Sequence, residues 1–109
     1  MSAPSISRVL VANRGAIARR VIRACHAMGI ETVAVFSEAD AQAPHIDEAT
    51  QAYPLAGFSA SDSYLDQDQL FQIARQSGAD DVHPGYGFLA ESVEFAERVV
   101  AEDKIFIGP

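Results

Sequence analysis

Short β-branched runs alternate along the chain with stretches of helical periodicity. The predicted strands are residues 8–12, 31–36, 51–55, 81–83 and 104–107, and the predicted helices are residues 16–28, 64–77 and 92–102, with one further helical turn at 44–50. Strands that alternate with helices across short loops indicate βαβ units. The pattern therefore predicts an α/β domain whose parallel sheet of four or five strands carries helices on both faces.

The apolar positions of the helices predict which of their faces are buried. Ile17, Val21, Cys25 and Met28 share one side of the first helix, with Ala18 and Ile22 at its margin. The candidate inward positions of the two later helices are Leu65, Leu70, Ile73 and Ala74, and Val93, Ala96, Val99 and Val100.

The composition is typical of one small domain. The chain has 109 residues, 49% of them hydrophobic, and a net charge of −7, which argues against nucleic acid as its main partner. Its one cysteine, Cys25, excludes an internal disulfide. No apolar run reaches the roughly 18 residues of a membrane span, and residues 1–7 are too short and uncharged for a secretory signal. We expect no membrane association and a cytoplasmic location.

The charges are distributed unevenly along the chain. Residues 1–30 contain five arginines and no acidic residue, whereas residues 31–109 contain all 15 acidic residues. Arg19, Arg20 and Arg23 lie on the outer side of the first helix, where no acidic side chain of that helix accompanies them. Either this is a solvated face or it meets an acidic partner surface.

The turn after the first strand resembles a dinucleotide-binding turn in position only. Such a turn needs three glycines, so that backbone amides can approach a pyrophosphate, and here only Gly15 is present. Nicotinamide or flavin binding is therefore not expected. Asn13 is expected to cap the following helix.

The glycine-rich segment at residues 83–88 follows a predicted strand. Gly85 and Gly87 flank Tyr86 at the carboxyl end of that strand, where open α/β sheets bind ligands. Glycines allow close backbone approach or a positive φ angle, so the segment is either a ligand-binding loop or an ordinary strand-to-helix connection. His83 has no histidine or cysteine at ligand spacing, so no metal site is predicted.

No reaction centre can be recognised. Phosphoryl transfer needs cationic groups on the phosphates and carboxylates on Mg²⁺, but Lys104 is the sole lysine and no P-loop is present. No nucleophile with a histidine base can be placed either. We expect no catalytic residue in this sequence.

Five blocks of sequence resemble the start of biotin carboxylases, the family of acyl-CoA, pyruvate and urea carboxylases. The blocks, in the family's order, are residues 9–15 (VLVANRG), 31–37 (ETVAVFS), 63–65 (SYL), 83–91 (HPGYGFLAE) and 105–109 (IFIGP). The resemblance implies a Rossmann-like, three-layer domain that precedes an ATP-grasp fold. It also implies that residues 1–109 are an N-terminal fragment of such an enzyme.

The resemblance implies a function for the complete enzyme. That enzyme would use Mg-ATP and bicarbonate to carboxylate biotin held on a carrier domain, and it would act as a homodimer. The family's phosphate-binding lysines, Mg²⁺ ligands and catalytic residues lie after the last block. The fragment is therefore expected to be inactive and to bind no cofactor tightly.

The resemblance also implies two sets of functional residues. Gly85, Tyr86, Gly87 and Glu91 match a segment on the biotin side of the active site, and Arg20 and Arg23 match positions that contact the second subunit in dimeric members. One departure is Ala16, where many members have glutamate. It removes a carboxylate that would interact favourably with the helix dipole.

Two other classes of protein remain as alternatives. A stand-alone receiver-like binding module would need an acidic pair after its first strand, but no acidic residue precedes Glu31. The pre-ATP-grasp domain of a carbamoyl-phosphate or purine-biosynthesis ligase is the stronger alternative, and the segment HPGYGFL favours the biotin carboxylase branch.

Overall fold

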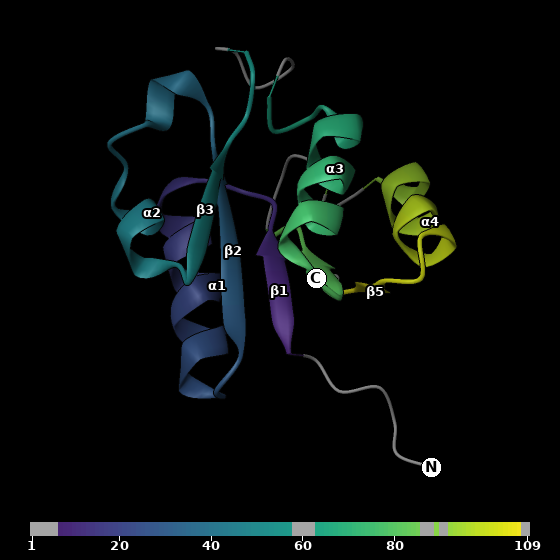
Figure 1. Cartoon of the computed structure of the whole chain (residues 1–109), viewed down its shortest axis with the longest axis horizontal. Coiled ribbons are helices and arrows are strands. Elements are labelled where there is room, and N and C mark those ends of the chain that lie inside the picture. Colours follow the sequence, from purple (N-terminus) through teal and green to yellow (C-terminus); the bar gives the residue numbers. More distant parts are fainter. Residues whose placement is uncertain (1–6, 58–62, 86–88, 90–91, 108–109) are drawn as a thin grey trace.

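A computed structural model describes residues 7–57, 63–85, 89 and 92–107 of the chain. Five strands and four α-helices alternate within this part of the chain (Figure 1). In chain order the elements are β1 (Arg8–Val11), α1 (Gly15–Ala27), β2 (Glu31–Phe36), the 3₁₀ turn η1 (Glu38–Asp40), α2 (Pro44–Glu48), β3 (Gln51–Pro54), α3 (Gln67–Ser77), β4 (Asp81–His83), α4 (Val93–Ala101) and β5 (Ile105–Phe106).

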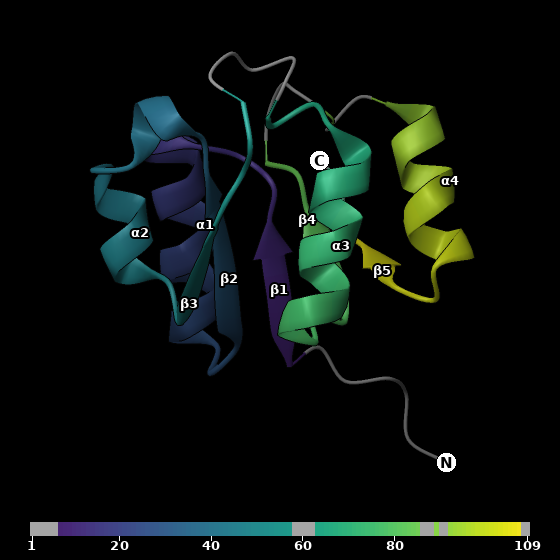
Figure 2. The same cartoon turned by 45° about the horizontal axis from the view of Figure 1, so that its top comes forward.

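The five strands form one parallel sheet in the order β3-β2-β1-β4-β5. Helices α1 and α2 cover one face of this sheet, and α3 and α4 cover the other (Figure 2). The prediction of an α/β, three-layer domain with a parallel sheet is confirmed. Five is the larger of the two predicted strand numbers.

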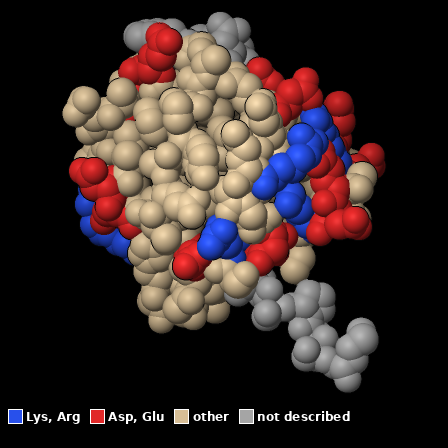
Figure 3. Space-filling view, viewed as in Figure 1, with Lys and Arg blue, Asp and Glu red and all other residues tan. Residues whose placement is uncertain are grey.

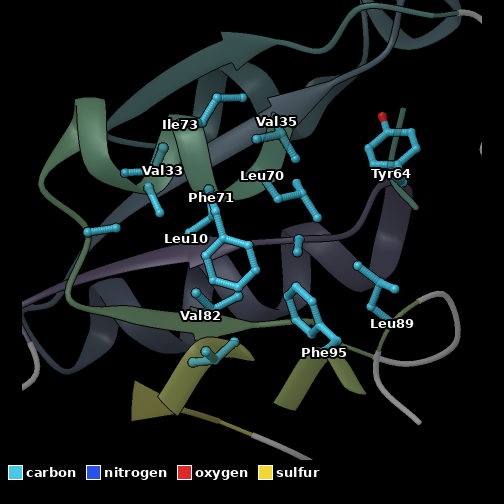
Figure 4. Packing of buried hydrophobic residues seen from close by; sticks show 14 of the residues in the cluster. Leu10, Val33, Val35, Tyr64, Leu70, Phe71, Ile73, Val82, Leu89 and Phe95 are labelled. Carbon is cyan, nitrogen blue, oxygen red and sulfur yellow. The ribbon is translucent and has the colours of Figure 1, made fainter. Parts of the chain in front are cut away.

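Alternate residues of the strands supply the two halves of the core. Val9, Val11 and Ala34 pack against Ala18 and Ile22 of α1. The intervening strand positions, Leu10, Val33, Val35 and Val82, belong to the larger cluster beneath α3 and α4 (Figure 4). Because successive side chains of a strand point to opposite faces, a sheet covered on both faces needs uninterrupted apolar runs.

The buried face of α1 differs from the prediction by part of a turn. Ala18, Ile22 and Cys25 are its buried residues, whereas Met28 is 75% exposed. Met28 follows the last residue of the helix, so the helical periodicity no longer applies to it.

The two helices on the other face also differ from the prediction. The helix expected at residues 64–77 begins at Gln67, with Asp66 as its N-cap, and Leu65 is exposed, whereas Tyr64 is buried. In α4 the buried residues are Phe95 and Val99, which lie four residues apart.

Two of the predicted inward positions of α4, Val93 and Val100, are 71% and 65% exposed. The ring of Phe95 lies 5.5 Å from that of Phe71, measured between centroids, and this pair turns the other face of α4 inward (Figure 4). An aromatic pair buries more area than a valine, so it decides the rotation of the helix.

Candidate functional site at the carboxyl edge of the sheet

The strand order has one topological switch point, which lies between β1 and β4. The chain leaves β1 toward β2 on one side, and β4 lies on the other side of β1. Crevices at such points, outside the carboxyl ends of the strands, are where open α/β sheets bind ligands. The turn after β1 and the segment after β4 are therefore the first places to look for a site.

Asn13 joins these two segments. Its side chain is buried, its Nδ2 donates a hydrogen bond of 2.7 Å to the carbonyl oxygen of Pro84, and its Oδ1 accepts one of 2.8 Å from the backbone N–H of Arg14. The N-cap of α1 is Arg14, which makes no side-chain capping bond. The expectation that Asn13 caps the helix is wrong, because its amide spans the switch point instead.

Gly85 lies against the same turn. Its φ angle is +71°, and a Cβ atom at this position would lie 2.7 Å from Cγ2 of Ile17 and 3.0 Å from Nδ2 of Asn13. Both reasons for a glycine that the sequence suggested, a positive φ and a close approach, therefore apply at this residue. A larger residue here would have to displace the side chain of Ile17 or that of Asn13.

His83 supports the start of the same segment. Its Nδ1 accepts a hydrogen bond of 3.0 Å from the backbone N–H of Gly85, which requires that nitrogen to be unprotonated. Burial lowers the pKa of His83, because the charged imidazolium loses its hydration there. The ring is thus a neutral part of the turn.

The other members of the predicted biotin-side set, Tyr86, Gly87 and Glu91, lie outside the described residues. Their assignment stays a prediction. Gly85, the described residue that directly precedes Tyr86, lies close to the side chains of Asn13 and Ile17.

A second group of side chains at this edge was not predicted from the sequence. Asp40 Oδ1 accepts a hydrogen bond of 2.5 Å from Arg14 Nη2, and Asp40 Oδ2 accepts one of 2.6 Å from Arg14 Nε. The same Oδ2 accepts a bond of 2.6 Å from the hydroxyl of Tyr64, which in turn accepts one from the backbone N–H of Ser37. The group ties the turn after β1 to the segments that follow β2 and β3.

The electrostatics of this group are those of a fixed ion pair. The bidentate guanidinium of Arg14 lowers the pKa of Asp40 to about 2, although burial opposes the shift. Asp40 in turn raises the pKa of Arg14, and burial raises that of Tyr64. A sequence signal existed, since Asp40 follows a buried strand, but its partners could not be chosen without the sheet order.

The basic side of α1 has a counterion within the chain. Glu48, at the end of α2, accepts a hydrogen bond of 2.5 Å from Arg19 Nε and one of 2.9 Å from Arg23 Nε. The outer side of α1 is thus neither simply solvated nor free of acidic neighbours. Arg20 has no hydrogen-bond or ion-pair partner among the described residues. Of the two predicted subunit-interface residues, Arg23 uses its Nε to pair with Glu48, whereas Arg20 is unpaired within the described chain.

Within the described part of the chain, no three His, Cys, Asp or Glu side chains come together as a metal site would require. The helices in that same part are all too short or too polar to cross a membrane.

The chain is similar to known proteins along almost all of its length. The family model described as "Biotin carboxylase, N-terminal domain" matches residues 5–109. Biotin carboxylase 2 of Bacillus subtilis (strain 168) is 50% identical over 103 residues, which are 94% of this chain and 23% of that protein. The mitochondrial methylcrotonoyl-CoA carboxylase subunit alpha of Rattus norvegicus is 50% identical over 96% of this chain and 15% of its own length.

Solved structures show the same fold at similar identities. The urea amidolyase of K. lactis matches 95% of this chain with 40% identity and a TM-score of 0.93, and the match covers 6% of that protein. A pyruvate carboxylase of Rhizobium etli matches 95% of this chain with 43% identity and a TM-score of 0.90, and the match covers 11% of that protein.

The chain thus spans less than a quarter of the length of these relatives. The resemblance inferred from the five sequence blocks is confirmed, and the receiver-like and other-ligase alternatives are set aside. The match over residues 5–109 shows that this chain belongs to the family of biotin carboxylase N-terminal domains.

Proposed function

We propose that the chain acts as the N-terminal domain of a complete biotin carboxylase, a ligase that uses ATP and bicarbonate to carboxylate biotin held on a carrier domain. The family match over residues 5–109 and the small share of each relative that the chain spans support this role. The partners of the domain are then the ATP-grasp remainder of the enzyme, the biotin carrier domain and a second enzyme subunit.

One observation carries the proposal for the site. The hydrogen bond from Asn13 to Pro84, together with the packing of Gly85 on Ile17, closes the switch point with protein atoms. The edge of the sheet is thereby a rigid support for the glycine-rich segment. Tyr86 and Gly87 directly follow Gly85, and we assign them to the biotin side of the active site, together with Glu91.

The described residues do not fit a site for Mg-ATP. The sole lysine, Lys104, donates a hydrogen bond of 2.6 Å to the carbonyl oxygen of Ala79, just before β4 and hence at the amino edge of the sheet. Asp40, a buried acidic residue at the carboxyl edge, is neutralised by Arg14. ATP and Mg²⁺ therefore belong to the remainder of the enzyme, and this domain contributes position and shape.

Steady-state kinetics of the complete enzyme test the biotin-side assignment. Tyr86→Phe and Gly87→Ala are expected to raise the KM for free biotin while the KM for ATP stays the same, because the change lies on the biotin side alone. Tyr53→Phe is the matched control, since the hydroxyl of Tyr53 donates only to Gln51 on the edge strand β3. Equal changes in both KM values, or none, would contradict the assignment.

A second experiment tests the division of labour. The isolated chain is expected to show no bicarbonate-dependent ATP hydrolysis with free biotin, whereas the complete enzyme is active. Measurable turnover in a preparation freed of contaminating ATPases would show that a reaction centre lies within these residues.

A further inference from the structure

The outer side of α1 is hollowed beside its first turns. The hollow has a volume of about 220 Å³ and is lined by Ala16, Arg19, Arg20 and Arg23. Three of these four residues carry guanidinium groups, and the fourth has the small methyl side chain that leaves the space open. The hollow is open to solvent and has room for a small polyatomic ion.

Most hydrogen-bond donors around the hollow have no protein acceptor. A guanidinium carries five N–H donors, and Glu48 takes only the Nε–H of Arg19 and the Nε–H of Arg23. The Nη groups of both side chains, and the whole guanidinium of Arg20, have no acceptor in the described part of the chain.

The charges around the hollow are also unbalanced. Three arginines line the hollow, but Glu48 is the one carboxylate in the described chain that pairs with any of them, and it pairs with Arg19 and Arg23. Helix α1 has no acidic side chain in its first turn. The pairing with Arg19 lowers the pKa of Glu48, so this carboxylate is already committed as an anion. Because Glu48 bridges Arg19 and Arg23, it also keeps these two guanidinium groups close together. Their positive charges repel each other, and a further anion would relieve this repulsion.

We propose that this hollow binds a multivalent oxyanion of the phosphate type. Guanidinium groups match phosphate oxygens with paired N–H donors, and several of them around one space favour a dianion over chloride. Ala16 supplies the room and Arg20 the uncommitted charge. The site lies on the outer side of α1 and does not depend on the assignment of the biotin-side residues. It uses Arg20 and Arg23, the arginines of the proposed subunit contact, so phosphate and a second subunit would compete for them.

NMR of the ¹⁵N-labelled 109-residue chain tests the proposal directly. Sodium phosphate is titrated at pH 7.5 with ionic strength held constant by sodium chloride, and the arginine Nε–Hε resonances are followed. Those of Arg19, Arg20 and Arg23 are expected to shift to saturation. Those of Arg8 and Arg75 are expected to stay in place, because Glu31 and Glu102 bind these guanidinium groups elsewhere.

Two variants at Ala16 separate charge from volume. Ala16→Glu places a carboxylate in the hollow and is expected to weaken phosphate binding at least about tenfold, in line with the loss of one charge-assisted hydrogen bond. Ala16→Gln has the same shape without the charge, and its affinity is expected to lie between those of the wild type and Ala16→Glu. Arg20→Gln is expected to weaken binding as Ala16→Glu does.

The outcomes that overturn the proposal are distinct. Shifts that stay linear, or that sodium chloride produces equally, show general screening and no site. Phosphate affinity that is no weaker in Ala16→Glu than in Ala16→Gln removes the arginine-lined hollow as the binding place. Resonances that move with protein concentration and not with phosphate show that acidic side chains of a second copy occupy the hollow instead.

Discussion

Two buried carboxylates of this domain have opposite surroundings. Asp40 is neutralised by Arg14, whereas neither oxygen of Asp81 has a hydrogen-bond partner among the described residues. Burial, followed by the neighbouring carboxylate of Asp80, raises the pKa of Asp81 to about 7, and Lys104 opposes this only in part. As pH rises, ionisation of Asp40 therefore stabilises the folded state, whereas ionisation of Asp81 destabilises it.

Asp81 is expected to make stability fall with rising pH. In the unfolded chain it ionises near pH 4, but in the fold only near pH 7, so the folded state keeps its proton longer. The free energy of unfolding should decrease between about pH 4 and pH 7 by up to about 4 kcal/mol from this group. Urea unfolding of Asp81→Asn should show a much flatter profile in this window, with Asp47→Asn as an exposed control. Parallel profiles of Asp81→Asn and the wild type would disprove it.

Asp40 is expected to have the opposite effect. Its pKa is lowered to about 2 in the fold, so the stability that it contributes is present above about pH 4 and is lost as pH falls toward 2. Asp40→Asn should cost about 2 kcal/mol at pH 7, and this difference from the wild type should vanish near pH 2. Glu38→Gln, a change at an exposed neighbour, should have no such profile in urea unfolding. A difference that persists at pH 2 would assign the cost to packing.

At the scale of elements, the contact between two loops matters most for the site. The segment after β4 touches the turn after β1 through Asn13 and Pro84, and it touches the first turn of α1 through Ile17 and Gly85. Neither loop has regular hydrogen bonding of its own at this point, so each depends on the other for its position. A substitution in one loop should therefore shift the position of the other.

Gly85→Ala tests this dependence. Gly29 has a similar positive φ, +75°, but a Cβ atom there meets nothing within 4 Å, so Gly29→Ala measures the backbone cost alone. Gly85→Ala adds the clash with Ile17 and should cost about 1–3 kcal/mol more in the free energy of unfolding. In the complete enzyme, it should also raise the KM for biotin. Equal costs at the two glycines would mean that the loops are not in firm contact.

At the scale of the whole molecule, the two faces differ in whether their charged side chains are paired. The face over α3 and α4 carries basic side chains interspersed with acidic ones, including the pairs Arg75–Glu102 and Arg98–Asp68 (Figure 3). On α1, by contrast, Arg20 has no partner in the described chain. An interface with another subunit gains most where charges are not already satisfied, which favours α1.

Reversal of this charge tests the proposed subunit contact. Arg20→Glu combined with Arg23→Glu is expected to weaken self-association of the complete enzyme, and sedimentation velocity at low protein concentration measures it. Arg20→Glu alone should weaken self-association less than the double variant does. Because this change breaks no ion pair within the described chain, its effect reports on the subunit contact alone. Gln72→Glu with Gln76→Glu, on the exposed side of α3, is the control for added negative charge. An unchanged sedimentation coefficient in the double variant would remove α1 from the interface.

The amino-acid sequence by itself determined the family, the alternation of strands and helices, and the glycine-rich segment that follows β4. These follow from local patterns, because apolar periodicity and turn chemistry act over a few residues. The same patterns misplaced Val93 and Val100, because the rotation of α4 depends on the aromatic contact with α3.

Only the tertiary structure decided which distant side chains meet. Asn13 and Pro84 are 71 residues apart, and Arg14 and Asp40 are 26 apart. Their pairing depends on β1 lying between β2 and β4, a strand order that no local pattern encodes. The same holds for the counterion of the basic helix, Glu48, and for the burial of Asp81, because both arise where separate elements pack together.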